Sequence, residues 1–111
     1  MISQLKGAVT HIDPKYIILD VQGVGYKVFT TMDTMSKLNK TVDLNRTVNA
    51  EKSKEKTLTT LWTYLAVREN AMDLYGFLSL SELNFFELLI TISGIGPKTA
   101  LGILNLASVH T

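Results

Sequence analysis

The chain has 111 residues, 46% of them apolar, and a formal net charge of +1 at pH 7. This length allows one domain or two small ones with a modest core, and the charge is low for a protein that binds nucleic acid by bulk electrostatics alone. The absence of cysteine excludes a disulfide framework and a thiolate metal site, and it suits a reducing cytoplasm. No stretch is long and apolar enough to cross a membrane, so we expect no membrane partner.

Residues 1–77 have a β-like pattern. A β-branched run at 17–21 and an alternating run at 26–30 predict two strands with a turn over Gln22–Gly25. Further strand-rich runs cover residues 58–67 and 72–77. Several short strands joined by polar turns predict a five-stranded, OB-type β-barrel over residues 1–77 rather than a parallel sheet.

Residues 43–57 are the most polar part of the chain. Lys52, Lys54 and Lys56 alternate there with Ser and Glu. We interpret this segment as an insertion, either a solvated loop or extended hairpin, or an arm that contacts DNA.

The hydrophobic period changes after Phe77, and we expect a domain boundary near Leu78. Ser79 followed by Glu82 has the form of a capping box, and apolar residues then cover most of a helix up to Ile92. A helix so apolar is expected to be buried, against its hairpin partner and the barrel or a neighbouring subunit. A second helix over residues 98–107 completes a helix–hairpin–helix, so the fold class is mainly β plus α.

The segment Gly94-Ile95-Gly96-Pro97-Lys98-Thr99 joins the two helices. Its glycines permit a tight, partly left-handed turn, and Pro97 suits the first residue of a helix. The N–H groups of such a turn, beside a positive helix end, would bind a phosphate oxygen. A Walker loop would need glycine at Pro97 and a dinucleotide fingerprint would need glycine at Thr99, so neither motif is present. A plain helical hairpin without a ligand is the alternative.

Catalytic side chains are scarce. His11 and His110 are the only histidines, cysteine is absent, and no acidic cluster has the spacing of metal ligands. We therefore expect a non-enzymatic protein without catalytic residues, metal or cofactor. Residues 71–111 contain one cation, Lys98, against three acids, so the turn would hold phosphate mainly through backbone dipoles.

Four sequence blocks, in order along nearly the whole chain, carry a family resemblance. They are Met1-Ile2-x-x-Leu5-x-Gly7, Asp20-Val21-x-Gly23-Val24-Gly25-Tyr26-x-Val28, Val67-Arg68-Glu69 with Leu74-Tyr75-Gly76-Phe77, and Gly94-Ile95-Gly96-Pro97-Lys98. Together they resemble the RuvA family, the Holliday-junction-binding subunits of the bacterial branch-migration complex in DNA recombination and repair.

The resemblance implies a cytoplasmic homotetramer that holds an open four-way junction while a partner ATPase, RuvB, moves the duplexes. By motif, the phosphate-gripping turn consists of Gly94, Ile95, Gly96, Lys98 and Thr99. Glu69 falls on the first position of an acidic pin at the tetramer centre, and Asn70 takes the second, where the family usually has another acid. A carboxylate there would repel a continuous duplex but fit the central hole of an open junction. The alternative is that Glu69 is an ordinary exposed turn acid.

The chain departs from the family at two further places. Residues 43–57 are longer than the family's segment, and the chain ends at Thr111, before the second hairpin and the RuvB-binding domain. The helix–hairpin–helix region, 78–111, is therefore expected to be truncated.

Two other functions remain open. A generic OB module for single-stranded nucleic acid would use strand aromatics as stacking platforms, with Tyr16, Tyr26, Phe29, Trp62 and Tyr64 as candidates. An assembly role without DNA contacts is the other.

Overall fold

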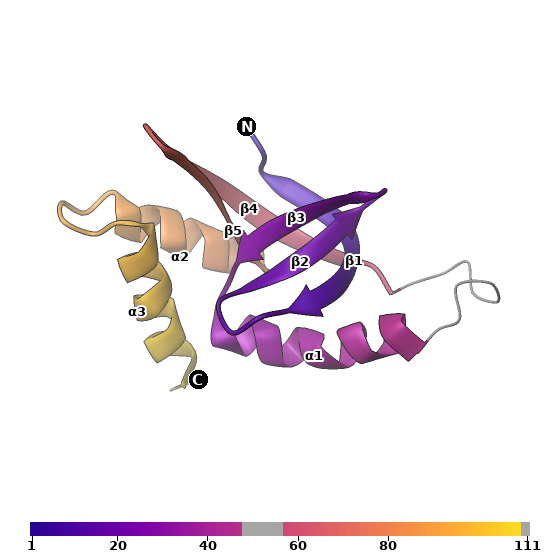
Figure 1. Cartoon of the computed structure of the whole chain (residues 1–111). Coiled ribbons are helices and arrows are strands. Elements are labelled where there is room, and N and C mark those ends of the chain that lie inside the picture. Colours follow the sequence, from indigo (N-terminus) through magenta and orange to yellow (C-terminus); the bar gives the residue numbers. More distant parts are fainter. Residues whose placement is uncertain (48–56, 110–111) are drawn as a thin grey trace.

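The computed structural model describes residues 1–47 and 57–109, which form a closed barrel with helices beneath it and on one side (Figure 1). In chain order the elements are β1 (Gln4–Ile12), β2 (Tyr16–Val21), β3 (Val24–Phe29), α1 (Met32–Thr47), β4 (Thr59–Arg68), β5 (Ala71–Phe77), α2 (Leu80–Ile90) and α3 (Pro97–Val109).

The barrel closes in the order β1-β2-β3-β5-β4. Its neighbouring strands are antiparallel except β3 and β5, which are parallel. Parallel neighbours need a crossover, and here α1 and β4 supply it. The predicted OB-type barrel followed by a helix–hairpin–helix is confirmed.

The β2–β3 turn shows why the strands pair as they do. Gln22 and Gly23 both have positive φ, 50° and 93°, as a two-residue hairpin turn requires. The Asp20 carboxylate accepts a hydrogen bond from the Gly23 N–H at 2.9 Å. The turn therefore fixes the register in which Val21 faces Val24.

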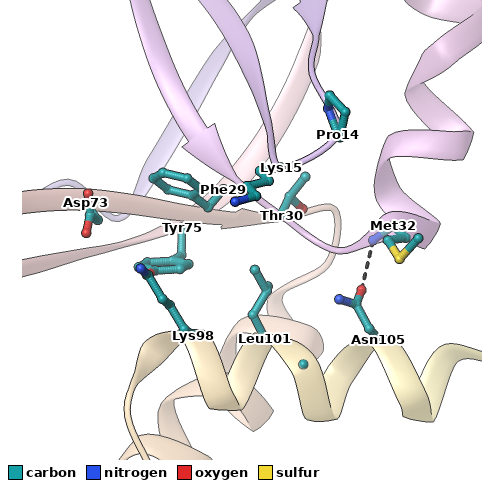
Figure 2. Close-up of a pocket in the computed structure, with 11 residues that line it drawn as sticks. Pro14, Lys15, Phe29, Thr30, Met32, Asp73, Tyr75, Lys98, Leu101 and Asn105 are labelled. Atoms are coloured by element: carbon teal, nitrogen blue, oxygen red, sulfur yellow. Dashed lines mark hydrogen bonds between the residues drawn. The ribbon is translucent and has the colours of Figure 1, made fainter.

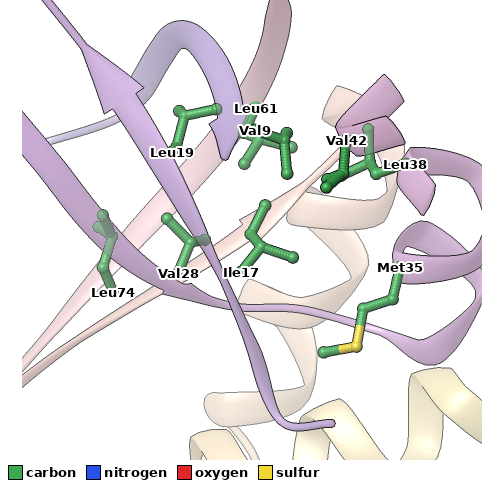
Figure 3. Packing of buried hydrophobic residues seen from close by; sticks show 9 residues of the cluster. All are labelled: Val9, Ile17, Leu19, Val28, Met35, Leu38, Val42, Leu61 and Leu74. Carbon is green, nitrogen blue, oxygen red and sulfur yellow. The ribbon is translucent and has the colours of Figure 1, made fainter. Parts of the chain in front are cut away.

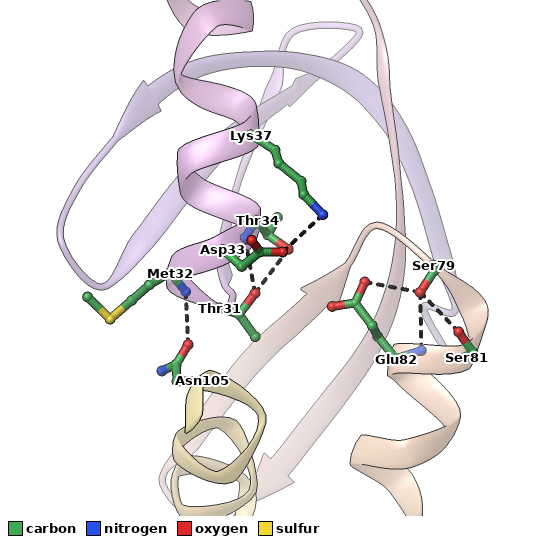
Figure 4. A network of polar contacts seen from close by, with 9 residues as sticks. All are labelled: Thr31, Met32, Asp33, Thr34, Lys37, Ser79, Ser81, Glu82 and Asn105. Atoms are coloured by element: carbon green, nitrogen blue, oxygen red, sulfur yellow. Dashed lines mark hydrogen bonds and ion pairs between the residues drawn. The ribbon is translucent and has the colours of Figure 1, made fainter. Parts of the chain in front are cut away.

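Helix α1 corrects the sequence-based prediction in two ways. Residues 32–47 are helical rather than β-like, and residues 43–47 end this helix instead of starting a polar loop. The rest of the expected insertion, residues 48–56, lies outside the described residues. Thr31 caps the N-terminus of the helix: its Oγ1 accepts a hydrogen bond from the Thr34 N–H at 3.2 Å. Asp33 and Lys37 form an ion pair at 3.0 Å on the first turns of the helix (Figure 4).

The barrel core depends on α1. Met35, Leu38 and Val42, spaced three and four residues apart, are buried against side chains from all five strands (Figure 3). The strand residues of this cluster are Val9, Ile17, Leu19, Val28, Leu61 and Leu74. Helix α1 thus closes one end of the barrel with apolar surface.

The two hairpin helices pack on the outer face of β4 and β5 and form a second core. Phe86 of α2 lies at its centre, with ring centroids 5.7 Å from Tyr64, 5.3 Å from Tyr75 and 5.0 Å from Phe77. Ser79 caps α2, as predicted: its Oγ accepts from the Glu82 N–H at 3.2 Å and donates to the Glu82 carboxylate at 3.0 Å (Figure 4).

Helix α2 packs against its hairpin partner and the barrel, as expected, but along one face only. Leu83, Phe86 and Leu89 are buried, whereas Leu88 is 61% exposed and Phe85 is exposed as well. Burial follows one face because the barrel contacts only that face. The opposite face is free to meet another molecule.

A hydrogen bond between α3 and α1 links the hairpin to the base of the barrel. The Asn105 side-chain oxygen accepts from the Met32 N–H at 2.9 Å, at the first residue of α1 (Figure 4). The first N–H groups of a helix have no partner within it, so Asn105 acts as a cap supplied from a distant element.

Candidate nucleic-acid interface

The gripping turn, Gly94–Thr99, combines the end of the α2–α3 connection with the start of α3: Gly94–Gly96 precede the helix, which begins at Pro97. Gly94 has φ +85°, a conformation that costs any residue with a Cβ. Gly96 does not have positive φ, so only one of the two glycines takes the left-handed conformation that the sequence suggested for the pair. The Gly96 carbonyl instead accepts the first hydrogen bond of α3, from the Ala100 N–H at 2.9 Å.

The turn presents backbone donors at the start of α3. Among the described residues, the N–H groups of Gly96, Lys98 and Thr99 have no hydrogen-bond acceptor. They lie at the positive end of the helix dipole, where an anion is favoured. This is the arrangement expected of a phosphate-binding nest.

The N–H group of Ile95 is not available to bind a phosphate. It donates a hydrogen bond to the Ile92 carbonyl, at 3.1 Å, inside the turn. Its side chain is partly buried and packs against the second core. Ile95 therefore anchors the turn, and the outward donors come from its neighbours.

Open space surrounds the glycines. A Cβ at Gly94 or at Gly96 would have no heavy atom within 4 Å beyond its chain neighbours. A phosphate oxygen could therefore reach the backbone N–H groups at ordinary hydrogen-bond distance, about 2.9 Å.

Lys98 lies at one end of a groove between α3 and the barrel (Figure 2). The groove has a volume of about 530 Å³ and includes Lys15, Phe29, Tyr75 and Asn105 among its lining residues. Lys98 and Lys15 are both exposed, from α3 and from the β1–β2 turn. Burial raises the pKa of Tyr75, and the nearby Asp73 carboxylate adds to this effect while Arg68 opposes it. Lys15 and Asn105 were not among the sequence candidates.

The pin, Glu69 and Asn70, forms the two-residue turn between β4 and β5. Both residues are exposed, and Arg68 pairs with Ala71 just behind them. The β4–β5 ribbon extends beyond the barrel, so the pin and the gripping turn form two separate protrusions (Figure 1). With one carboxylate at the tip, each chain contributes a single negative charge there.

Residues 1–47 and 57–109 contain no group of three or more His, Asp or Glu arranged to hold a metal ion. Within the same ranges, no helix combines the length and hydropathy needed to cross a bilayer.

Two family models match the sequence. Residues 1–76 match the RuvA N-terminal domain, and residues 86–110 match the SAM-like helix-hairpin-helix tandem. These ranges correspond to the barrel and to the hairpin region.

Individual relatives named "Holliday junction branch migration complex subunit RuvA" align with almost the whole chain. The protein from Acetivibrio thermocellus is 36% identical over 108 residues, covering 97% of this chain and 46% of the relative. The protein from Caldanaerobacter subterraneus is 34% identical over 111 residues, covering 100% and 52%. The Acinetobacter baumannii protein is 38% identical over 110 residues, covering 99% and 48%. The chain spans about half the length of these relatives.

Proposed function

Because the chain belongs to the RuvA N-terminal domain family, we propose that it is a non-catalytic DNA-binding subunit that recognises four-way junctions in recombination and repair. The observation that carries this proposal is the gripping turn, where the N–H groups of the exposed residues Gly96, Lys98 and Thr99 have no acceptor among the described residues. The relatives' name, which includes the Holliday junction, supports the choice of ligand.

The gripping turn would bind the DNA backbone rather than base edges. Backbone N–H groups hydrogen-bond phosphate oxygens whatever the sequence, and Lys98 adds one nearby cation. Since few cations take part, each chain should release few counterions, and affinity should depend only weakly on salt.

The pin would supply selectivity for junction structure. Glu69 repels phosphates, which disfavours any DNA that runs continuously past the tip of the β4–β5 ribbon. An open junction has no backbone at its centre, so it avoids this repulsion. Because Asn70 is uncharged, only the Glu69 carboxylate of each chain contributes to this repulsion.

We further propose that the chain assembles as a cytoplasmic homotetramer and that RuvB is the motor of the complete complex. The exposed apolar side chains of α2 support assembly, because surface of this kind is usually covered in a complex. Four copies around one axis would match the fourfold form of an open junction. Multi-angle light scattering at high micromolar concentration tests this; a monomer would contradict it.

Binding to DNA is tested by gel shifts with a four-way junction, a duplex and a single strand of matched sequence. We expect the junction to bind most tightly at low salt. Equal affinity for all three would contradict structure-specific recognition, and preference for the single strand would favour a generic OB module.

The generic OB module has weaker support. Phe29 and Tyr64 pack against the second core, and Trp62 does the same, so these rings are not free platforms. The Tyr16 ring is covered by Lys27, whose Nζ lies 4.5 Å from its centroid.

A further inference from the structure

The β4–β5 ribbon carries an apolar pair just behind its tip. Val67 and Met72 are direct partners in the antiparallel register, so their side chains lie on the same face of the ribbon. They are 58% and 67% exposed, respectively. One further pair, Arg68 and Ala71, separates them from the pin, which places the apolar pair two residues, about 7 Å, behind the tip.

This face is the continuation of the barrel interior. Two residues further back, Leu65 pairs with Leu74, and both belong to or pack against the barrel core. Side chains two apart along a strand share a face, so the apolar pair extends the inward face beyond the end of the barrel. Nothing in the described fold covers it there, although its exposure opposes the hydrophobic effect.

We propose that the apolar pair is a wedge that contacts unstacked bases at the branch point of the junction. This inference rests on the proposed function and adds a contact with the bases. Apolar side chains act in this way in other DNA complexes, where they insert at base steps and unstack them. The pair lies about two base steps, of 3.4 Å each, behind the tip.

The charges around the tip favour bases over the backbone as its occupant. Glu69 repels phosphates, whereas base faces are uncharged and apolar. Asn70 is an uncharged amide that can donate to and accept from base edges. The exposed Arg68 lies one residue from Val67, where it could hold a phosphate displaced from the centre.

The test uses the full chain and a four-way junction with 2-aminopurine at a crossover position, because this base becomes brighter when it is unstacked. The variant Val67→Thr/Met72→Gln keeps side-chain size and strand propensity but removes the apolar surface. We expect wild type to raise the fluorescence and the variant to lose most of the rise. Junction affinity should fall about tenfold, the scale of burying one such side chain, with duplex affinity unchanged.

Two further variants make the result specific. Val67→Ile/Met72→Leu keeps the surface apolar and should retain both the fluorescence rise and the affinity. Leu58→Gln alters a residue of similar exposure, 57%, next to the opposite end of β4, and should behave like wild type. Circular dichroism and light scattering show whether each variant keeps its fold and its oligomeric state.

The outcomes separate this inference from the proposed function. If wild type prefers the junction but the polar variant gives the same fluorescence and affinity, the wedge is refuted and junction binding stands. If the polar variant loses its oligomeric state, the pair contacts a neighbouring copy and the wedge is refuted. If wild type shows no preference for the junction, the proposed function and the wedge both fail.

Discussion

Alanine at Gly94 should reduce stability, whereas alanine at Gly96 should reduce DNA binding, although the two glycines are only two residues apart. Gly94 has φ +85°, which costs a residue with a Cβ about 1–2 kcal/mol. For a chain of this size, about 1 kcal/mol corresponds to about 4 °C, so Gly94→Ala should lower the Tm by about 4–8 °C. The loss comes from backbone strain, because the added methyl group meets no heavy atom within 4 Å beyond its chain neighbours.

Gly96→Ala should leave the Tm almost unchanged but weaken junction binding. Its backbone lies outside the left-handed region and its Cβ position is open, so the alanine fits. Alanine is a slightly poorer N-cap than glycine, which lowers the free energy of unfolding, but it also restricts the unfolded chain, which raises this free energy. The two effects should cancel to within about 0.5 kcal/mol. The methyl group would stand where a phosphate must approach. Losing one charge-assisted hydrogen bond costs about 1.5–3 kcal/mol, which is about tenfold or more in Kd.

The measurements are thermal melts followed by circular dichroism and fluorescence anisotropy with a labelled junction at low salt. Gly102→Ala is the matched control: this glycine lies inside α3 with open space around it, so alanine should stabilise the helix by about 0.5–1 kcal/mol without affecting binding. Wild-type affinity in Gly96→Ala would remove the Gly96 N–H from the interface. A wild-type Tm in Gly94→Ala would refute the strained turn.

Four other changes test separate parts of the site and fold. Glu69→Lys should raise duplex affinity relative to junction affinity, and Asn70→Asp should lower duplex affinity relative to junction affinity. Both effects should shrink as salt rises, and a junction-to-duplex affinity ratio that stays constant across the variants in low-salt gel shifts would refute the pin. Lys98→Ala should weaken binding to every DNA form and reduce the slope of log Kd against log salt by about one unit, and an unchanged slope would mean no phosphate contact. Asn105→Leu should cost about 1 kcal/mol of stability in urea titrations, whereas Asn105→Asp should keep the α1 cap and the stability. Because burial raises the Tyr75 pKa, the folded state keeps a proton that the unfolded chain loses above about pH 10. Stability should therefore decline as pH rises beyond that point, and Tyr75→Phe should reduce the decline in urea titrations at successive pH values.

The barrel strands and both hairpin helices could be predicted because their signals are local. Strand alternation, the Ser79 cap and the Gly-Pro turn all act within a few residues of one another. Helix α1 could not be predicted in the same way. Its threonines and asparagines favour caps and turns, and only three apolar residues form its buried stripe in the described part. These apolar residues stabilise the helix only by packing against the barrel strands. Those strands are distant in sequence, so a short stretch of sequence does not reveal the contact.

The candidate site was predictable to a similar degree. The motif located the gripping turn and the pin, but it could not distinguish the strained Gly94 from the relaxed Gly96, since both are simply glycine. It also could not show that Ile95 uses its N–H inside the turn. Asn105 carries no local signal at all, because its partner is 73 residues away.

Strand β5 belongs to both cores, and this has a consequence for how the protein unfolds. Leu74 points into the barrel cluster, whereas Tyr75 and Phe77 pack with the hairpin helices. The Gly76 carbonyl between them accepts a hydrogen bond from Thr30, at 2.6 Å, just after β3. Removing the hairpin would expose Tyr75 and Phe77 on one face of β5, a strand that the barrel needs for closure. Barrel and hairpin should therefore melt in a single cooperative transition, and a chain cut after Phe77 should not persist as an independent barrel.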